Sequence, residues 1–446
     1  MPAHNSPTVD RTVPSATDQA TERVLRADVH TAVSQLLGER RLLTPDVEDE
    51  ERIRTTIREQ ITAYQRRAAS TNAPLLTDPQ ATEQRLVDDV LGLGILQPFM
   101  LAPDIEEIIC NGPNRIFVIA DGQKRLLPDL YFEDDDELRQ LVKRLVGPLG
   151  RRLDETSPLV DARLPDGARL NAAIPPATTR WCAVTIRKFI LRAHSLEQLV
   201  TLGTLSNSAA QFLDAAVQAG LNILVSGPTG SGKTTLLNAL GAAIASLDER
   251  VVTVEEVAEL QLEDRLPDCV GLQARGNNVE GIGAIHIRDL VRNALRMRPT
   301  RIVVGEVRGA EALDMLLAMN TGHEGSLTTI HGNSARDALE RLVTLAMMAE
   351  ERLSGEALTK MVARTIDLVV HVQFDPHSGQ RRITSIFEVT GLEGTTLIGQ
   401  ELWTLAPTHE RLSWTGTQPR CLAKYAAKGV PYSLPLAEDA VSVRLS

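Results

Sequence analysis

The stretch VSGPTGSGKTTLLNAL, residues 225–240, constrains the fold more than any other part of the chain, because small turn-forming residues and one lysine separate two apolar runs. Its spacing Gly-x-x-x-x-Gly-Lys-Thr fits the Walker A pattern, which requires a strand before it and a helix after it. Glycines let the backbone turn so that N–H groups point at phosphate oxygens, and the helix adds the positive end of its dipole. We therefore expect a nucleotide-binding loop made of Gly227, Pro228, Thr229, Gly230, Ser231, Gly232, Lys233, Thr234 and Thr235.

The expected ligand is ATP with Mg²⁺. Lys233 would neutralise the β- and γ-phosphates, and Thr234 would offer its hydroxyl to the metal. The apolar run RIVVG then delivers one carboxylate, Glu306, at its end. An acid after a strand is usually a solvated turn residue, but one that follows a phosphate loop in the same sheet favours a role in binding metal and activating water. Thr234 and Glu306 are therefore the candidate metal ligands.

Further candidates also follow apolar strands. VTVEEVAEL presents Glu255, Glu256 and Glu259 after another apolar strand, and Glu255 and Glu256 are the candidate catalytic bases, with a charged helix start as the alternative interpretation. His331 ends the run SLTTIH and could sense the γ-phosphate or orient water, although a lone histidine is more often a structural hydrogen-bonding residue. His323 follows a helix-terminating glycine, so we expect it to make a C-cap contact.

Three arginines, Arg288, Arg292 and Arg296, recur every four residues in IRDLVRNALRMRPTR, beside an apolar helical face. One interpretation is a solvated basic face. The other is that these guanidinium groups, which bind phosphate and carboxylate bidentately, complete an ATP site across subunits. The sequence leaves both interpretations open.

Composition argues against several classes of protein. The 446 residues carry a net charge of −11, the pI is near 5.4 and aromatic residues make up 3%. This balance argues against a nucleic-acid binder that works through bulk positive charge. The four cysteines form no C-x-x-C pair, so neither a zinc knuckle nor a redox dithiol is indicated. Because no run approaches the roughly 20 apolar residues that a bilayer demands, any membrane association is expected to be peripheral.

The hydrophobic pattern divides the chain into successive parts. Residues 1–15 have the composition of a flexible tail, and helical spacing over 16–75 predicts an N-terminal helical region. Mixed patterns over 76–203 predict an α+β domain, in which the acidic run EDDDEL begins a helix. Over 204–395, apolar strands alternate with helices, which predicts an α/β domain with a parallel-rich sheet covered on both faces. Residues 396–446 are expected to form a C-terminal extension.

Several stretches together resemble a known family: GPTGSGKTT, VTVEEVAEL, ARLPDGARLNAAIPP, and the block from HIRDLVRNALRMRPTRIVVGEVRG to GSLTTIHGNSARDALERL. They are similar to the secretion ATPases that power type II secretion, type IV pili and type IV secretion. Within that family they look most like the CpaF/TadA branch, which assembles tight-adherence (Flp) pili. The resemblance runs from Leu86 to Gly429.

The resemblance implies a RecA-like P-loop ATPase domain, an N-terminal domain that closes over the nucleotide, and a homo-hexamer acting on an inner-membrane platform protein. It implies a cytoplasmic protein, peripheral at the inner face of the cytoplasmic membrane, and no nucleic-acid partner is expected. It assigns residues 255–260 to the acidic box, His331 to the histidine box and Glu306 to the Walker B position. Arg169 and Arg187 would reach the nucleotide phosphates from the N-terminal domain.

This sequence also departs from the family. Glu256 stands where the acidic box commonly has Asp, Gly332 replaces a residue that is usually Ala, and ATTRWCA replaces a commoner Asp-Gly-Pro turn. The last two departures concern local geometry, and none removes a charge that the mechanism needs.

Alternatives remain at this stage. A conjugation or effector-secretion motor would share every catalytic residue. A RecA-like nucleic-acid translocase would need basic, aromatic-bearing loops, which the composition disfavours. A non-catalytic nucleotide-binding scaffold would lack Lys233 or Glu306, and both are present.

Overall fold

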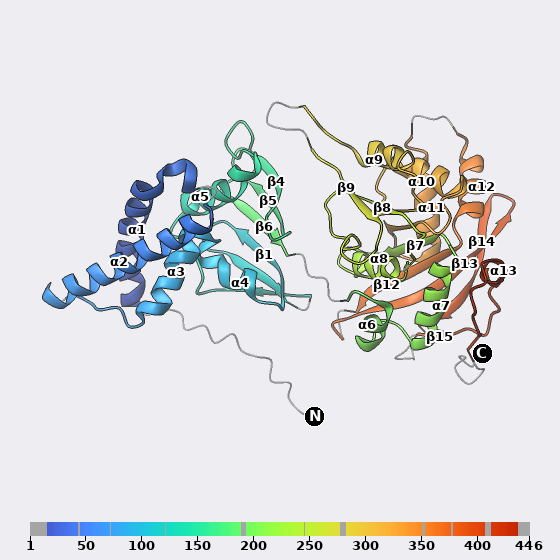
Figure 1. The fold of residues 1–446 in the computed structure, drawn as a ribbon, viewed down its shortest axis with the longest axis horizontal. Helices are drawn as coiled ribbons and strands as arrows, with labels where there is room; N and C mark the ends of the chain where they lie inside the picture. The colour runs from blue at the N-terminus through green and yellow to red at the C-terminus, as the bar shows by residue number, and fades with distance from the viewer. Residues whose placement is uncertain are drawn as a thin grey trace, which may run out of the picture. The chain divides into compact units, whose positions relative to one another are not determined.

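The computed structural model describes residues 16–42, 45–71, 73–120, 122–188, 193–244, 246–276, 282–349, 353–375, 378–405 and 412–435. The chain divides into two compact units, residues 1–190 and 191–446, and each is considered by itself (Figure 1). The predicted tail, residues 1–15, lies outside the described residues.

The first unit begins with three packed helices, α1 (Ala16–Leu42), α2 (Val47–Thr71) and α3 (Pro79–Leu91). Apolar residues at helical spacing put one stripe of each helix into a common core, for example Val29, Ile57 and Val87. The bundle therefore extends past residue 75, the predicted end of the helical region, because α3 is needed to bury the apolar stripes of the other two helices.

A six-stranded antiparallel sheet follows, in the order β3-β2-β1-β6-β5-β4. Its strands are β1 (Ile105–Asn111), β2 (Ile116–Ala120), β3 (Gln123–Leu126), β4 (Leu159–Arg163), β5 (Arg169–Ala173) and β6 (Ala183–Arg187). The accompanying helical segments are η1 (Gly94–Leu96), α4 (Gln97–Leu101), α5 (Asp135–Val146) and η2 (Gly147–Leu149). Alternate strand residues such as Ile108 and Val184 are buried in one core with Leu138 of α5.

The acidic run at residues 133–138 begins α5, as predicted. The Glu137 N–H donates to the Asp134 carboxylate at 2.8 Å, and the Glu133 N–H donates to the Glu137 carboxylate at 2.6 Å. The first bond satisfies an N–H group that the first turn of a helix leaves without a partner, and the second holds the residue before the N-cap against the same turn. Glu137 also forms an ion pair with Arg26 of α1, which joins the helical bundle to α5.

The second unit is built on a nine-stranded sheet in the order β15-β14-β13-β12-β7-β11-β10-β8-β9. The strands β12, β7, β11, β10, β8 and β9 are parallel, and β13, β14 and β15 extend the sheet antiparallel. The strand bounds are β7 (Ile223–Gly227), β8 (Val251–Glu255), β9 (Cys269–Gln273), β10 (Arg301–Val304), β11 (Leu327–His331), β12 (Leu368–Asp375), β13 (Gln380–Glu393), β14 (Thr396–Thr404) and β15 (Ser413–Trp414).

Helices cover both faces of this sheet, because its central strands are apolar on both sides (Figure 1). One face carries α6 (Leu196–Thr201), α7 (Asn207–Gln218), α8 (Lys233–Ala242) and α13 (Leu422–Ala427). The other carries α9 (Ile287–Ala294), α10 (Glu311–Asn320), α11 (Ala335–Ala346) and α12 (Gly355–Thr365). The predicted fold class is confirmed: an α/β RecA-like P-loop domain with a parallel-rich sheet, preceded by an α+β domain and a helical region.

The limits of the second unit differ from the predicted 204–395. Residues 193–203 belong to it, since Ala193, Leu196 and Leu199 are buried in its core. The described part of 396–446 completes it: β14 pairs with β13, and Tyr425 of α13 lies with its ring 5.9 Å from that of Phe212. The limits of the second unit are set by strand pairing and packing between segments that lie far apart in the sequence. Local composition does not reveal such contacts.

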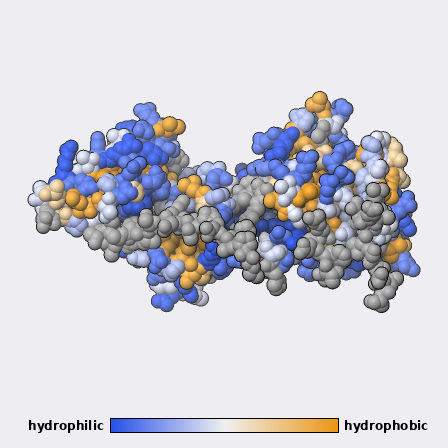
Figure 2. Space-filling model, turned by 90° about the horizontal axis from the view of Figure 1, so that it is seen from below, coloured by the Kyte–Doolittle hydropathy of each residue, from blue (hydrophilic) through white to orange (hydrophobic). Residues whose placement is uncertain are grey.

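The surface of the described residues mixes polar and apolar side chains. Figure 2 shows apolar residues lying among hydrophilic ones on the face it presents. Within the described ranges, none of the helices combines the length and the apolar character that crossing a bilayer requires.

Tyr425→Ala is expected to destabilise the second unit by about 3–5 kcal/mol, because it empties a buried aromatic site. Tyr425 is 2% exposed and its hydroxyl donates to the Phe212 carbonyl at 3.1 Å. Urea unfolding followed by tryptophan fluorescence measures the change, since Trp403 lies 4.5 Å from the Phe212 ring. The control is Lys428→Ala, at an exposed position just after α13. Equal unfolding midpoints for the two variants would show that α13 is peripheral to the fold.

Candidate functional site

The predicted nucleotide-binding loop connects β7 to α8. Gly230 and Gly232 have φ values of 74° and 99°, which glycine adopts without strain. Gly227 is required for another reason: a Cβ there would lie 2.2 Å from the Val372 carbonyl oxygen of β12. Pro228 and Thr229 are exposed, Ser231 is buried, and Thr234 and Thr235 are half-buried in the first turn of α8.

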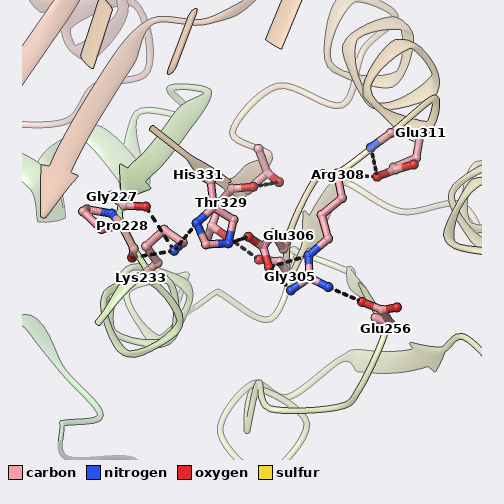
Figure 3. A network of polar contacts seen from close by, with 12 residues as sticks. Gly227, Pro228, Lys233, Glu256, Gly305, Glu306, Arg308, Glu311, Thr329 and His331 are labelled. Carbon is pink, nitrogen blue, oxygen red and sulfur yellow. Dashed lines mark hydrogen bonds and ion pairs between the residues drawn. The ribbon is translucent and has the colours of Figure 1, made fainter. Parts of the chain in front are cut away.

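The Lys233 ammonium lies inside this loop, and the side chain is buried. It donates to the carbonyl oxygens of Gly227 at 3.1 Å and Pro228 at 2.9 Å, and lies 3.5 Å from Nδ1 of His331 (Figure 3). The Ser231 hydroxyl also donates to the Pro228 oxygen, at 2.8 Å. The backbone of the loop thus surrounds the Lys233 ammonium.

His331 joins the loop to Glu306. β11 lies between β7 and β10, with His331 directly opposite Gly227, and Glu306 follows β10. Nε2 of His331 is 2.7 Å from Oε1 of Glu306. Burial and the Lys233 charge lower the pKa of His331, and the Glu306 charge opposes them. A neutral imidazole with its proton on Nε2, facing Glu306, leaves the Nδ1 lone pair facing Lys233.

Arg308 connects Glu306 to the acidic box. Its guanidinium lies 2.6 Å from Oε2 of Glu306 and 2.7 Å from Oε2 of Glu256 (Figure 3). Although partial burial opposes it, the Glu306 carboxylate raises the pKa of Arg308. Sequence reasoning did not select Arg308, and the signal that could have found it is its place two residues after Glu306.

The structure separates the two predicted acidic-box bases. Glu256 is exposed and lies in the network of Figure 3. Glu255 ends β8, is 4% exposed, and accepts hydrogen bonds from the N–H groups of Glu259 at 2.9 Å and Leu260 at 3.0 Å. Glu255 therefore holds the turn that follows β8.

The predicted arginines of the first unit lie side by side on its sheet. Arg169 of β5 is directly opposite Arg187 of β6, and Arg163 of β4 is opposite Arg169. Residues directly opposite in antiparallel strands share a face, so the three form a row of like charge, an arrangement that favours an anionic ligand. Arg163 was not among the residues predicted from the sequence. The signal that could have indicated it is the turn LPDGA, which places Arg163 opposite Arg169 in a hairpin.

The remaining candidates have partners within the second unit. Arg288 and Arg292 each donate to the Asp314 carboxylate of α10 at 2.7 Å, so they clamp α9 to α10. Arg296 donates to the Arg292 carbonyl at 3.0 Å. His323 lies 3.1 Å from the Ala318 carbonyl at the end of α10, which confirms the predicted C-cap contact.

The residues present fit a magnesium-bound polyphosphate. Oε1 of Glu306 is buried yet accepts no well-aligned hydrogen bond from the described residues, despite its contact with His331. It lies on the same sheet edge as the Lys233 ammonium, and at Gly230 of the loop nothing lies within 4 Å of the position that a Cβ would occupy. Thr234 and Glu306 would hold the metal, and Lys233 with the loop amides would hold the phosphates.

The fold and this loop define a RecA-like P-loop protein. Residues 90–391 match the family model described as "Type II/IV secretion system protein". The chain therefore belongs to the type II/IV secretion system protein family.

Curated relatives agree with that assignment. The chain is 39% identical over 324 residues to a putative conjugal transfer protein of Mycobacterium tuberculosis, covering 71% of this chain and 90% of that protein. It is 36% identical over 343 residues to the type IV secretion system protein PtlH of Bordetella pertussis, covering 71% and 99%. The VirB11 ATPase of the Brucella suis type IV secretion system is 30% identical, covering 69% and 96%, with a TM-score of 0.36.

Gly227→Ala and Gly230→Ala should differ in stability, although both lie in the loop. At Gly230 nothing lies within 4 Å of an added Cβ, so only backbone strain of about 1 kcal/mol is expected. At Gly227 the new methyl would displace the backbone of β12, and a loss of about 3 kcal/mol is expected. Urea unfolding of the two variants measures the difference, and similar losses would contradict the packing described for Gly227.

Proposed function

We propose that this chain is an ATP-hydrolysing motor that works as a homo-hexamer. It powers assembly of a tight-adherence or related type IV-like pilus, or type II/IV secretion, by acting on an inner-membrane platform. The observation that carries the proposal is the convergence of Lys233, His331 and Glu306 at the carboxyl edge of three neighbouring parallel strands. An ammonium among loop amides binds a polyphosphate, and a carboxylate beside it activates water.

Each residue has a role that follows from its position. Lys233 exchanges the loop carbonyls for oxygens of the β- and γ-phosphates. Thr234 and Glu306 hold Mg²⁺, which neutralises phosphate charge when bound. Glu306, with Glu256 beside it through Arg308, orients the attacking water and takes its proton. Glu255 supports this arrangement by holding the backbone turn of the acidic box.

The arginines of the first unit complete the proposed site. Arg169 and Arg187 stabilise charge on the γ-phosphate, in the manner of arginine fingers, when the first unit closes over the nucleotide. Closure around a ring of six subunits then couples hydrolysis to movement of the platform protein.

The biological process has two candidates. The motif resemblance supports pilus assembly by the tight-adherence branch. Relatives named for conjugal transfer and type IV secretion favour the alternative, a conjugation or effector-secretion motor with the same catalytic residues. Both put the protein in the cytoplasm, at the inner face of the cytoplasmic membrane. Prepilin, prepilin peptidase and platform genes beside this gene would select pilus assembly.

A RecA-like nucleic-acid translocase is the alternative of another class. The net charge of −11 and the 3% of aromatic residues disfavour it, because strand-tracking loops combine positive charge with stacking rings. ATP turnover that rises severalfold when DNA is added would select the translocase over the pilus or secretion motor.

Lys233→Ala should abolish ATP binding and turnover, since it removes the cation that the loop encloses. Glu306→Gln should bind ATP but lose turnover by about 10²-fold or more, because the amide cannot take a proton from water. Calorimetry with ATP and phosphate-release assays measure the two effects. The control is Lys360→Ala, in an exposed i,i+4 pair with Glu356. Normal turnover in either site variant would contradict the assignment.

Arg169→Ala and Arg187→Ala should each lower kcat by about 10³-fold, the scale of a lost arginine finger. ATP affinity should fall far less, because the loop of the second unit supplies most of the binding. Steady-state kinetics separates the two effects, with Arg125→Ala, at an exposed position of β3, as the control. A rise in KM at constant kcat would assign these arginines to ground-state binding instead.

A further inference from the structure

The paired strands β12 and β13 support the nucleotide-binding loop from the side away from His331. β12 pairs in parallel with β7, with His371 opposite Ser226 at the entry to the loop. From the next strand, β13, Nε of Arg381 donates to the carbonyl oxygen of Gly230 at 3.0 Å. The loop is therefore held by a side chain that lies 151 positions further along the chain.

Arg381 is held in place along its length. Its guanidinium carbon lies 5.4 Å from the ring centroid of Phe374, which is directly opposite in the β12–β13 register. Its Cδ lies 3.2 Å from the position that a Cβ of Gly232 would occupy. The side chain thus follows the loop from Gly230 to Gly232, and a Cβ at position 232 would lie closer to it than an ordinary van der Waals contact.

The hydrogen bond to Gly230 orients the following amide. In a planar trans peptide, the carbonyl of one residue and the N–H of the next point to opposite sides. Arg381 holds the Gly230 carbonyl, so the Ser231 N–H points the other way. There it donates to the Pro228 oxygen at 3.4 Å, the atom that also accepts from Lys233 at 2.9 Å. The Ser231 N–H thus points toward the inside of the loop, at an oxygen that the Lys233 ammonium also contacts.

We propose that Arg381 is a positioning residue of the nucleotide-binding loop, which fixes the peptide between Gly230 and Ser231 so that its N–H faces the bound phosphates. The inference deepens the proposed function and rests on it, because the loop ligand is taken to be ATP. Arg381 contacts the loop backbone and Phe374, so its effect is expected on binding and not on the chemical step.

Three substitutions of Arg381 in the full-length chain test the proposal. Arg381→Met keeps the apolar stem but removes the donor, so the Kd for ATP and for ADP should rise about tenfold, the size of one lost charge-assisted hydrogen bond. KM should rise by the same factor while kcat stays within about twofold. Arg381→Ala should show at least the same loss. Arg381→Lys keeps a charged donor and should return KM to within about threefold of the wild-type value.

The matched control is Arg382→Ala. Arg382 is the next residue on β13, and its Nε donates to the Gln380 side chain at 2.9 Å. Calorimetry and steady-state kinetics on this variant should match the wild type. Should Arg381→Met fail to fold, Arg381→Ala carries the test in its place: a KM raised about tenfold or more at constant kcat supports the proposal, and an unchanged KM overturns it.

The possible failures are distinguishable. A folded wild-type chain that binds no ATP would refute the proposed function itself. A wild type that binds ATP, together with a folded Arg381→Met variant of equal affinity and KM, would overturn only the role of Arg381. A lower kcat at unchanged KM would also overturn it, because that result would place the residue in the chemical step.

Discussion

The candidate site of the second unit is arranged around one buried ammonium, that of Lys233, whose residue is only 8% exposed. A buried charge costs several kcal/mol unless other groups replace its water. The carbonyls of Gly227 and Pro228 and the ring of His331 do so. All three are neutral acceptors, and the Glu306 carboxylate lies beyond the imidazole (Figure 3). These three contacts offer the charge neutral oxygen and nitrogen acceptors, and a bound polyphosphate would replace them with anionic oxygens.

The parallel sheet supplies this arrangement. Because β7, β11 and β10 are neighbours and run in the same direction, their carboxyl ends bring the loop, His331 and Glu306 to one edge. On the other side of β7, β12 closes against Gly227 and β13 carries Arg381 to Gly230. The end of β7 is thus supported from both sides. His331 contacts the loop on the β11 side, and the β12 backbone and Arg381 contact it on the other.

Much of this site could be predicted from the sequence, because its signals are local. The Walker A spacing, Glu306 and His331 each come at or after the end of an apolar strand. What could not be predicted depends on contacts between distant segments. Arg308 and Arg381 are ordinary surface arginines in sequence, and only their partners distinguish them. The acidic box offered equivalent glutamates, and the burial of Glu255 at the end of β8 separates it from exposed Glu256. The limits of the second unit escaped prediction for the same reason, since β14 and α13 join it by packing.

The contacts of Glu306 differ in strength, and the difference bears on how the site can rearrange. Arg308 is 54% exposed and Glu256 63% exposed, so solvent and salt screen their pairing, and such pairs contribute about 0–1 kcal/mol. The contact between Glu306 and His331 is more buried, with 21% and 28% of the side chains exposed. Arg308 can therefore leave Glu256 at little cost, while the imidazole keeps the Glu306 carboxylate at the sheet edge. Of these contacts, the one between Arg308 and Glu256 is therefore the one that the binding of a charged ligand can most easily replace.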